Sequence, residues 1–412
     1  MKMLKGKLIV AQSGGPTAVI NASLSGVIRE ASKHAGIESI YGLVHGIEGV
    51  LNEEMVDLTH ESQQTVDLLV QTPGSALGSC RHKLSDDEYE QILNLFQAHN
   101  VRHFVYIGGN DSMDTCHRIS ALADEAGYDM QVMGVPKTVD NDLAITDHTP
   151  GFGSAARFMA LAARDTGRDL EAMATFEDVS ILESMGRNAG WLTASAALGK
   201  VEEDEAPHLI YVPEIAFDEV HFLDDVTNIH RRLGRVFVVV CEGIRDVDGN
   251  FVGQHKLGSG SSDAFGHALP TLTAGVALYL SDLVSQRLAL RSRFLRPVLI
   301  GRGFTACVAE TDRKEAQMVG AEAVRQLANG QSGYMITIER LSDAPYKSQT
   351  GLAPLAEVAN AEKLLPRDFI NEDGNNIAGG FFDYALPLID GPLPPLARLN
   401  GIRVEKVISP AN

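Results

Sequence analysis

The chain has little cysteine, no long apolar run and far fewer positive than negative charges. Its four cysteines form no CxxC pair, which argues against a disulfide framework or a zinc knuckle and favours a reducing compartment. No stretch approaches the ~18 apolar residues of a membrane span. The early run LIVA is too short for the apolar core of a signal peptide. We therefore expect a cytoplasmic protein.

The charge balance limits the partners. The formal net charge of −19 argues against nucleic acids and membranes. A phosphate site on such a chain needs a local cluster of cations or a metal ion. Of the 412 residues, 44% are hydrophobic and 22% charged, which is ordinary for a globular protein, and the length favours two domains of ~150 residues each.

Short β-branched runs alternate with alanine-rich segments of helical period. Continuous apolar strands separated by helices predict parallel sheets covered on both faces, and their number predicts two such α/β layers. The glycine- and serine-rich segment 257–270 is predicted to be a mobile loop. The predicted strands are 7–12, 103–109, 132–136, 179–184, 208–213, 236–243 and 296–301, and the predicted helices are 17–33, 85–99, 111–126, 153–166, 189–198, 217–232, 270–290 and 312–329.

Two loops share a strand–Gly–Gly–polar–helix arrangement. In SGGPTAVINA, Gly14 and Gly15 stand between a strand and a helix, where backbone amides can approach an anion. In YIGGNDSMDT, Asn110 and Asp111 follow the two glycines. Neither loop matches GxGxxG or GxxxxGK[ST]. Each can also be interpreted as an ordinary tight turn, with Asp111 or its neighbour as a helix cap.

The stretch VPKTVDND places a cation and two carboxylates in one turn after a strand. Asp140 and Asp142 could together hold a divalent cation, or one could act as a general base while the other binds metal. Lys137 supplies a point charge suited to phosphate. Plain turn chemistry of Asp–Asn–Asp is the alternative.

Three further strand ends carry polar residues suited to a phosphorylated polyol. Arg81 follows the flexible stretch PGSALGS, and Gly186 and Arg187 follow a strand in SMGRNAGWL. Glu242 ends the most hydrophobic strand, where it can bind sugar hydroxyls or serve as a buried cap.

In order along the chain, SGG, GSxLGSxR, GGNDS, PKTVDND, TDHTPGFGSA, MGRNAGWL and CEG resemble the phosphofructokinases, from about residue 7 to about residue 330. The resemblance implies two doubly wound, Rossmann-like domains. Residues 1–150 and about 303–360 would bind the phosphoryl donor, and about 151–302 and 361–412 the sugar phosphate. It also implies that Asp140 takes the proton from the 1-hydroxyl of fructose 6-phosphate, with Mg²⁺ as the cofactor.

Two positions separate the branches of this family. ATP users resemble PGTIDND and have glycine where this chain has Asp111, whereas pyrophosphate users resemble PKTIDND, with a lysine at Lys137. A side chain at 111 occupies space that a nucleotide needs, and Lys137 supplies a cation for the short donor. The resemblance therefore implies a reversible, glycolytic, pyrophosphate-dependent 6-phosphofructokinase, with a homo-oligomer (a dimer favoured) as the assembly.

The site residues that the resemblance implies fall into four overlapping groups. They are the catalytic Asp140, Asp111 and Lys137; the pyrophosphate-binding Gly14, Arg81, Asp111 and Lys137; the substrate-binding Thr138, Val139, Asp140, Met185, Gly186, Arg187, Glu242, Arg293, Leu299 and Arg302; and the metal-binding Asn110 and Asp142.

The sequence also departs from the family pattern. Asn110 replaces a metal-binding aspartate, Leu299 and Gly301 replace a Tyr or His and a Gln, and Asp178 stands where many members insert an arginine from the neighbouring subunit. The alternatives are an ATP-dependent phosphofructokinase, a kinase of sedoheptulose 7-phosphate, and a catalytically weak regulatory paralogue.

Overall fold

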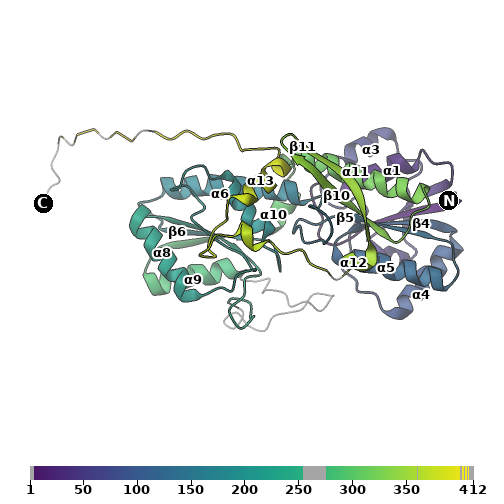
Figure 1. Ribbon diagram of the computed structural model, residues 1–412, viewed down its shortest axis with the longest axis horizontal. Coiled ribbons are helices and arrows are strands. Elements are labelled where there is room, and N and C mark those ends of the chain that lie inside the picture. Colours follow the sequence, from purple (N-terminus) through teal and green to yellow (C-terminus); the bar gives the residue numbers. More distant parts are fainter. Residues whose placement is uncertain are drawn as a thin grey trace.

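The computed structural model describes residues 4–253, 275–359, 361–399, 401–402, 404–405 and 407. Two β-sheets, each covered by helices on both faces, form two lobes (Figure 1). This confirms the predicted α/β architecture. The predicted mobile loop 257–270 lies outside the described residues.

The first sheet has seven strands in the order β11-β10-β5-β4-β1-β2-β3. Neighbours are parallel except for the antiparallel pairs β2–β3 and β10–β11 at the two edges. Side chains alternate between two cores: Leu8 and Val10 pack with α1 and α11, while Ile9 packs with α4 and α5. The elements are β1 (Gly6–Gln12), β2 (Ile37–Leu43), β3 (Met55–Asp57), β4 (Val101–Gly108), β5 (Gln131–Pro136), β10 (Tyr334–Asp343), β11 (Tyr346–Pro354), α1 (Ile20–Ala31), α4 (Asp86–Ala98), α5 (Asn110–Glu125) and α11 (Glu310–Ala328).

The second sheet has four parallel strands in the order β7-β8-β6-β9. Leu182 and Phe237 pack with α6 on one face, and Ile181 and Val238 pack with α8 and α9 on the other. The elements are β6 (Val179–Ser184), β7 (Leu209–Tyr211), β8 (Val236–Cys241), β9 (Ser292–Leu295), α6 (Phe152–Ala172), α8 (Glu219–Leu233) and α9 (Gly275–Leu288).

Short helices complete the described chain. They are α2 (Ile47–Leu51), α3 (Gln63–Leu69), α7 (Trp191–Ala194), α10 (Val298–Gly303), α12 (Leu355–Val358), α13 (Gly380–Ala385) and the 3₁₀ helices Ser195–Gly199, Thr305–Cys307, Arg367–Phe369 and Leu386–Ile389.

The predicted strand 296–301 is wrong, because α10 begins there at Val298. Pro297 has φ −70° and ψ −21°, which suit a helix start, and it has no N–H for a strand ladder. The sequence prediction also missed β2, β3, β9, β10 and β11.

The chain returns to the first sheet after completing the second. Strands β10 and β11 join the N-terminal strands, whereas several buried side chains between 365 and 389 pack with α6. The division into a donor-binding and a sugar-binding domain stays a prediction. All four cysteines are free and buried. Among the described residues, none of the helices is long and apolar enough to cross a membrane.

Candidate active site

The loops after β1 and β4 meet at the carboxyl edge of the first sheet. The hydroxyl groups of Ser13 and Ser112 are in hydrogen-bond contact, and Ser79 donates to the carbonyl of Gly14 at 2.6 Å. Gly14 has φ +73°, which favours glycine. Asp111 is exposed in the first turn of α5, one residue after Asn110. The helix is capped at Gly109, so Asp111 does not occupy the cap position.

A cavity of about 230 Å³ opens beside these loops. Two arginines line it together with the glycine turn, so it presents positive charge to a small anion. A side-chain carbon at Gly15 would lie 2.8 Å from Nη1 of Arg302, so a larger residue there would displace the end of this arginine. The lining residues are Gly14, Gly15, Pro16, Ser79, Cys80, Arg81 and Arg302.

Lys137 lies behind the glycine turn. Its side chain is 3% exposed, and its Nζ donates to the carbonyl of Gly15 at 3.1 Å. Burial lowers the pKa of Lys137 to about 8, with Asp140 opposing this and Arg302 adding to it. A buried ammonium with so few partners is suited to receive an anionic ligand.

The turn after β5 holds the two carboxylates in different surroundings. The backbone N–H of Asp140 donates to Oγ1 of Thr138 at 3.0 Å, and Asn141 between the carboxylates has φ +56°. Burial, then Asp142 and Glu242, raise the pKa of Asp140 to about 7 against the opposing charge of Lys137. Burial also raises the pKa of Asp142 above its usual range. A carboxyl group with a pKa near neutral pH is suited to general-base catalysis.

The side chains of Asn110 and Asp142 are in contact. Nδ2 of Asn110 donates to Oδ2 of Asp142 at 3.5 Å, which leaves Oδ1 of Asn110 pointing elsewhere. That Oδ1 and Oδ1 of Asp140 are buried with no hydrogen-bond partner in the described part of the chain. Oxygen atoms of this kind are the ligands that Mg²⁺ prefers, so the residues present fit the ion.

Four of the residues predicted to bind the sugar phosphate lie at the carboxyl edge of the second sheet. Met185, Gly186 and Arg187 follow β6 and Glu242 follows β8, and the last residues of these two strands are paired. At Gly243 a side-chain carbon would lie 1.8 Å from the carbonyl oxygen of Arg187, so only glycine allows this approach. Burial raises the pKa of Glu242. Asp140 is influenced by both Glu242 and Arg187, so it stands between the two sets of loops.

Several predicted sugar-site residues lie apart from this cluster. Arg293 pairs with Ser180 near the start of β6, at the opposite end of that strand from Arg187, and forms an ion pair with Glu177. Leu299 is 64% exposed on α10. Asp178 is ion-paired with Arg291 at 2.9 Å. Arg302, which is also predicted to bind the sugar phosphate, lines the cavity beside the glycine turn.

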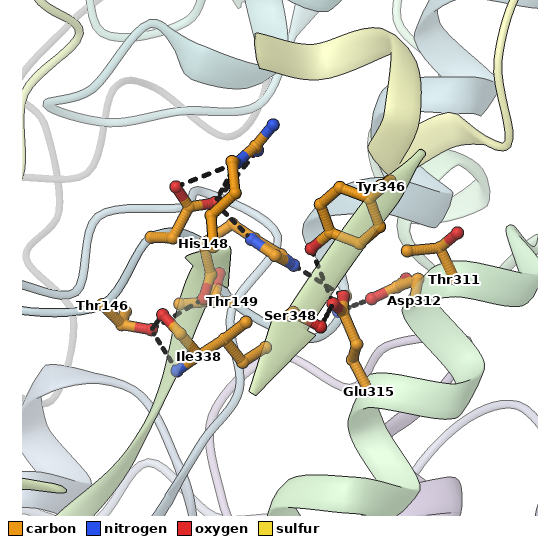
Figure 2. A network of polar contacts seen from close by, with 12 residues as sticks. Thr146, His148, Thr149, Thr311, Asp312, Glu315, Ile338, Tyr346 and Ser348 are labelled. Atoms are coloured by element: carbon orange, nitrogen blue, oxygen red, sulfur yellow. Dashed lines mark hydrogen bonds and ion pairs between the residues drawn. The ribbon is translucent and has the colours of Figure 1, made fainter. Parts of the chain in front are cut away.

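The motif TDHTPGFGSA is anchored by a buried polar network (Figure 2). Nε2 of His148 contacts Glu315 of α11 at 2.6 Å, and Nδ1 contacts Asp147 at 2.7 Å. Glu315 also accepts from Tyr346 of β11 at 2.7 Å. Burial alone would lower the pKa of His148, but Glu315 and Asp147 raise it to about 9. The motif thereby ties the segment after β5 to α11 and β11.

Two side chains near the turn were not singled out from the sequence. Nζ of Lys363 donates to the carbonyl of Asp147 at 2.7 Å, and the hydroxyl of Tyr384 donates to the same carbonyl at 2.8 Å. They belong to a C-terminal segment without periodicity or a known motif, so only the structure brings them to the site.

Comparison with known proteins gives consistent matches. The phosphofructokinase family model matches residues 7–327. The chain is 44% identical over 398 residues to a pyrophosphate–fructose 6-phosphate 1-phosphotransferase of Xanthomonas campestris, covering 95% of this chain and 93% of that one. It is 40% identical to a protein of the same name from Rhodospirillum rubrum, covering 99% and 100%.

Among solved structures, a pyrophosphate-dependent phosphofructokinase of Marinobacter aquaeolei superposes with a TM-score of 0.84 at 38% identity, covering 98% of both chains. The sequence matches, the fold and the residues gathered at the carboxyl ends of the strands all point to the same family. The chain belongs to the phosphofructokinase family.

Proposed function

We propose that this chain is a pyrophosphate-dependent 6-phosphofructokinase. It transfers a phosphoryl group from pyrophosphate to the 1-hydroxyl of fructose 6-phosphate and forms fructose 1,6-bisphosphate in glycolysis. The observation that carries this is Lys137 together with Asp111, in a chain with relatives of that name at 44% and 40% identity over nearly its full length. ATP use, sedoheptulose 7-phosphate as the acceptor, and a regulatory paralogue are not favoured.

In the proposed reaction, the sugar O1 attacks the terminal phosphorus of pyrophosphate. The bond from that phosphorus to the bridging oxygen breaks, and orthophosphate leaves. The O1 proton passes to Asp140, whose pKa of about 7 leaves a large fraction as carboxylate at neutral pH. Because the phosphoryl donor and the sugar product have comparable phosphoryl bonds, we propose that the reaction is reversible.

The donor is proposed to bind in the cavity beside Gly14, against Arg81 and the ammonium of Lys137. Asp111 stands at the start of α5, where it repels and blocks a nucleotide. Arg302 lines the same cavity, so we extend its proposed role from the 6-phosphate of the sugar to the transferred phosphoryl group.

The acceptor is proposed to bind on the other side of Asp140. The carboxylate of Glu242 accepts hydrogen bonds from the sugar hydroxyls, and Arg187 holds the 6-phosphate. The proposed contacts are completed by Thr138, Val139, Met185 and Gly186. Leu299 is a weaker candidate because it is exposed. Arg293 faces away from its own chain's cluster, so it would need a second subunit to reach an acceptor, as the proposed dimer would supply.

Mg²⁺ is proposed to bind through Asn110 and Asp142, and its chemistry is to neutralise charge on the phosphoryl oxygens. Oδ1 of Asn110 and Oδ1 of Asp140, which have no hydrogen-bond partner among the described residues, support this. The cytoplasm is the proposed compartment, which the four free cysteines support.

A donor and acceptor panel tests the proposal. Pyrophosphate, ATP and polyphosphate are each assayed with fructose 6-phosphate and with sedoheptulose 7-phosphate, with Mg²⁺ and again with excess chelator. We expect turnover with pyrophosphate, fructose 6-phosphate and Mg²⁺. Full activity in chelator would exclude the metal, and a preference for ATP would exclude the donor assignment.

A further inference from the structure

A short C-terminal segment, residues 361–365, crosses the two loops that carry the proposed donor and acceptor residues. We call it the clip. The backbone N–H of Lys363 donates to the carbonyl of Asp142 at 2.8 Å, and Glu362 forms an isolated antiparallel bridge with Leu143. On its other side, Asn188 donates to Glu362 at 2.7 Å, and the indole N–H of Trp191 donates to the carbonyl of Lys363 at 2.9 Å. The clip therefore joins the turn after β5 to the loop after β6.

The ammonium of Lys363 points into the turn. It donates to Oδ1 of Asn141 at 3.4 Å and to the carbonyls of Thr146 and Asp147 at 3.1 and 2.7 Å. An ammonium has three N–H donors, and these three acceptors match them. Nζ also lies 5.0 Å from the centre of the Trp191 ring, within the range of a cation–π contact.

Tyr384 of α13 holds the same turn from a different direction. Its hydroxyl accepts from Nδ2 of Asn141 at 2.9 Å and donates to the carbonyl of Asp147 at 2.8 Å. Its ring packs against Trp191, with centroids 5.2 Å apart. Both polar groups of the Asn141 side chain are therefore engaged, one by Lys363 and the other by Tyr384.

Asn141 is the residue at which the turn reverses. It is fully buried and has φ +56°, a conformation that non-glycine residues adopt only when the surroundings hold them in it. The reversal separates the carboxylates on either side of it. Asp140 is left among Lys137, Glu242 and Arg187, while Asp142 is left beside Asn110.

We propose that Lys363 and Tyr384 are positioning residues for phosphoryl transfer, which hold Asn141 so that Asp140 is fixed between donor and acceptor. The proposal rests on the proposed function. Both residues lie beyond residue 327, where the match to the family model ends, and outside the motifs that carry the resemblance.

The test compares Lys363→Met and Tyr384→Phe with wild type in the pyrophosphate assay. We expect kcat to fall about tenfold or more while KM for each substrate stays within about threefold, because neither side chain lines the donor cavity and the loss is one of alignment. Lys347→Met is the matched control, since Lys347 is exposed on β11 and should keep wild-type kcat. Should Lys363→Met fail to fold, Tyr384→Phe still tests the proposal, because it removes only one oxygen atom.

A double-mutant cycle separates positioning from general stability. Asn141→Gly keeps the reversed backbone but removes the anchor, so Tyr384→Phe should lower kcat far less in that background than in wild type. The proposal is overturned if Tyr384→Phe lowers kcat equally in the wild-type and Asn141→Gly backgrounds, or if kcat stays within about twofold in both single variants. It is also overturned if each single variant regains wild-type kcat when assayed well below its melting temperature. A wild type inactive with pyrophosphate would instead refute the function, which is a separate outcome.

Discussion

Replacing Lys137 with methionine keeps the length of the side chain and removes its charge. Burial lowers the pKa of Lys137 from an ordinary 10.5 to about 8, which corresponds to about 3 kcal/mol of unfavourable burial for the ammonium. We expect pyrophosphate in the neighbouring cavity to supply the missing counter-charge. A charge-assisted contact of this kind contributes about 2 to 3 kcal/mol, so we expect Lys137→Met to lower kcat/KM for pyrophosphate by about 30- to 150-fold.

The assay is initial velocity at saturating fructose 6-phosphate with pyrophosphate varied, and then the reverse. KM for the sugar should change little. Because Lys137 opposes the rise in the pKa of Asp140, the acid limb of the pH–rate profile should also move to higher pH in the variant. Lys347→Met controls for loss of a lysine elsewhere. A change of less than about threefold in kcat/KM for pyrophosphate would refute the reasoning, as would an equal rise in both KM values.

Four further outcomes are expected. Asp140→Asn should lower kcat by roughly 10²–10⁴-fold with little change in melting temperature, and near-normal kcat would rule Asp140 out as the base. In wild type, kcat/KM should fall as the pH drops through about 7, where Asp140 becomes protonated, so a flat profile from pH 6 to 8 would contradict the assignment. Arg302→Ala should raise KM for pyrophosphate as well as for the sugar, because Arg302 lines the donor cavity; an effect on the sugar alone would return it to the sugar site. The pKa of His148 is about 9 when folded, above its ordinary 6.5, so its stabilisation of up to about 3 kcal/mol is complete below pH 6.5 and lost as the pH rises through 9. Wild type should then lose more melting temperature than His148→Gln between pH 6.5 and 9.5, and parallel losses would refute this.

Much of the fold could be predicted because its strands are short apolar runs with clear ends. The run VSILES was predicted over 179–184, and β6 has those bounds. Glycine pairs after β1 and β4 likewise marked turns that the structure places side by side. Local patterns also placed Asp140 and Arg187 in loops just beyond strand ends, where the structure has them, while their roles stay predictions.

The rest depends on contacts between distant parts of the chain. The apolar run at 296–301 looks like a strand, but Pro297 cannot donate to a ladder and a helix follows. Strands β10 and β11 form the antiparallel pair at one end of the sheet, and much of their length is partly or fully exposed, which weakens their apolar pattern. The ammonium of Lys363 acts more than 200 positions from the turn it contacts, and nothing near it in sequence signals that role.

The central claim is that Asp111 and Lys137 make pyrophosphate the donor. The most direct measurement is kcat/KM for pyrophosphate and for ATP in wild type, in Asp111→Gly, and in Asp111→Gly combined with Lys137→Gly. We predict that wild type prefers pyrophosphate, that Asp111→Gly gains measurable ATP use, and that the second change weakens pyrophosphate further, by about 2 kcal/mol in kcat/KM. A wild type that prefers ATP, or a donor ratio that stays unchanged in both variants, would contradict the account.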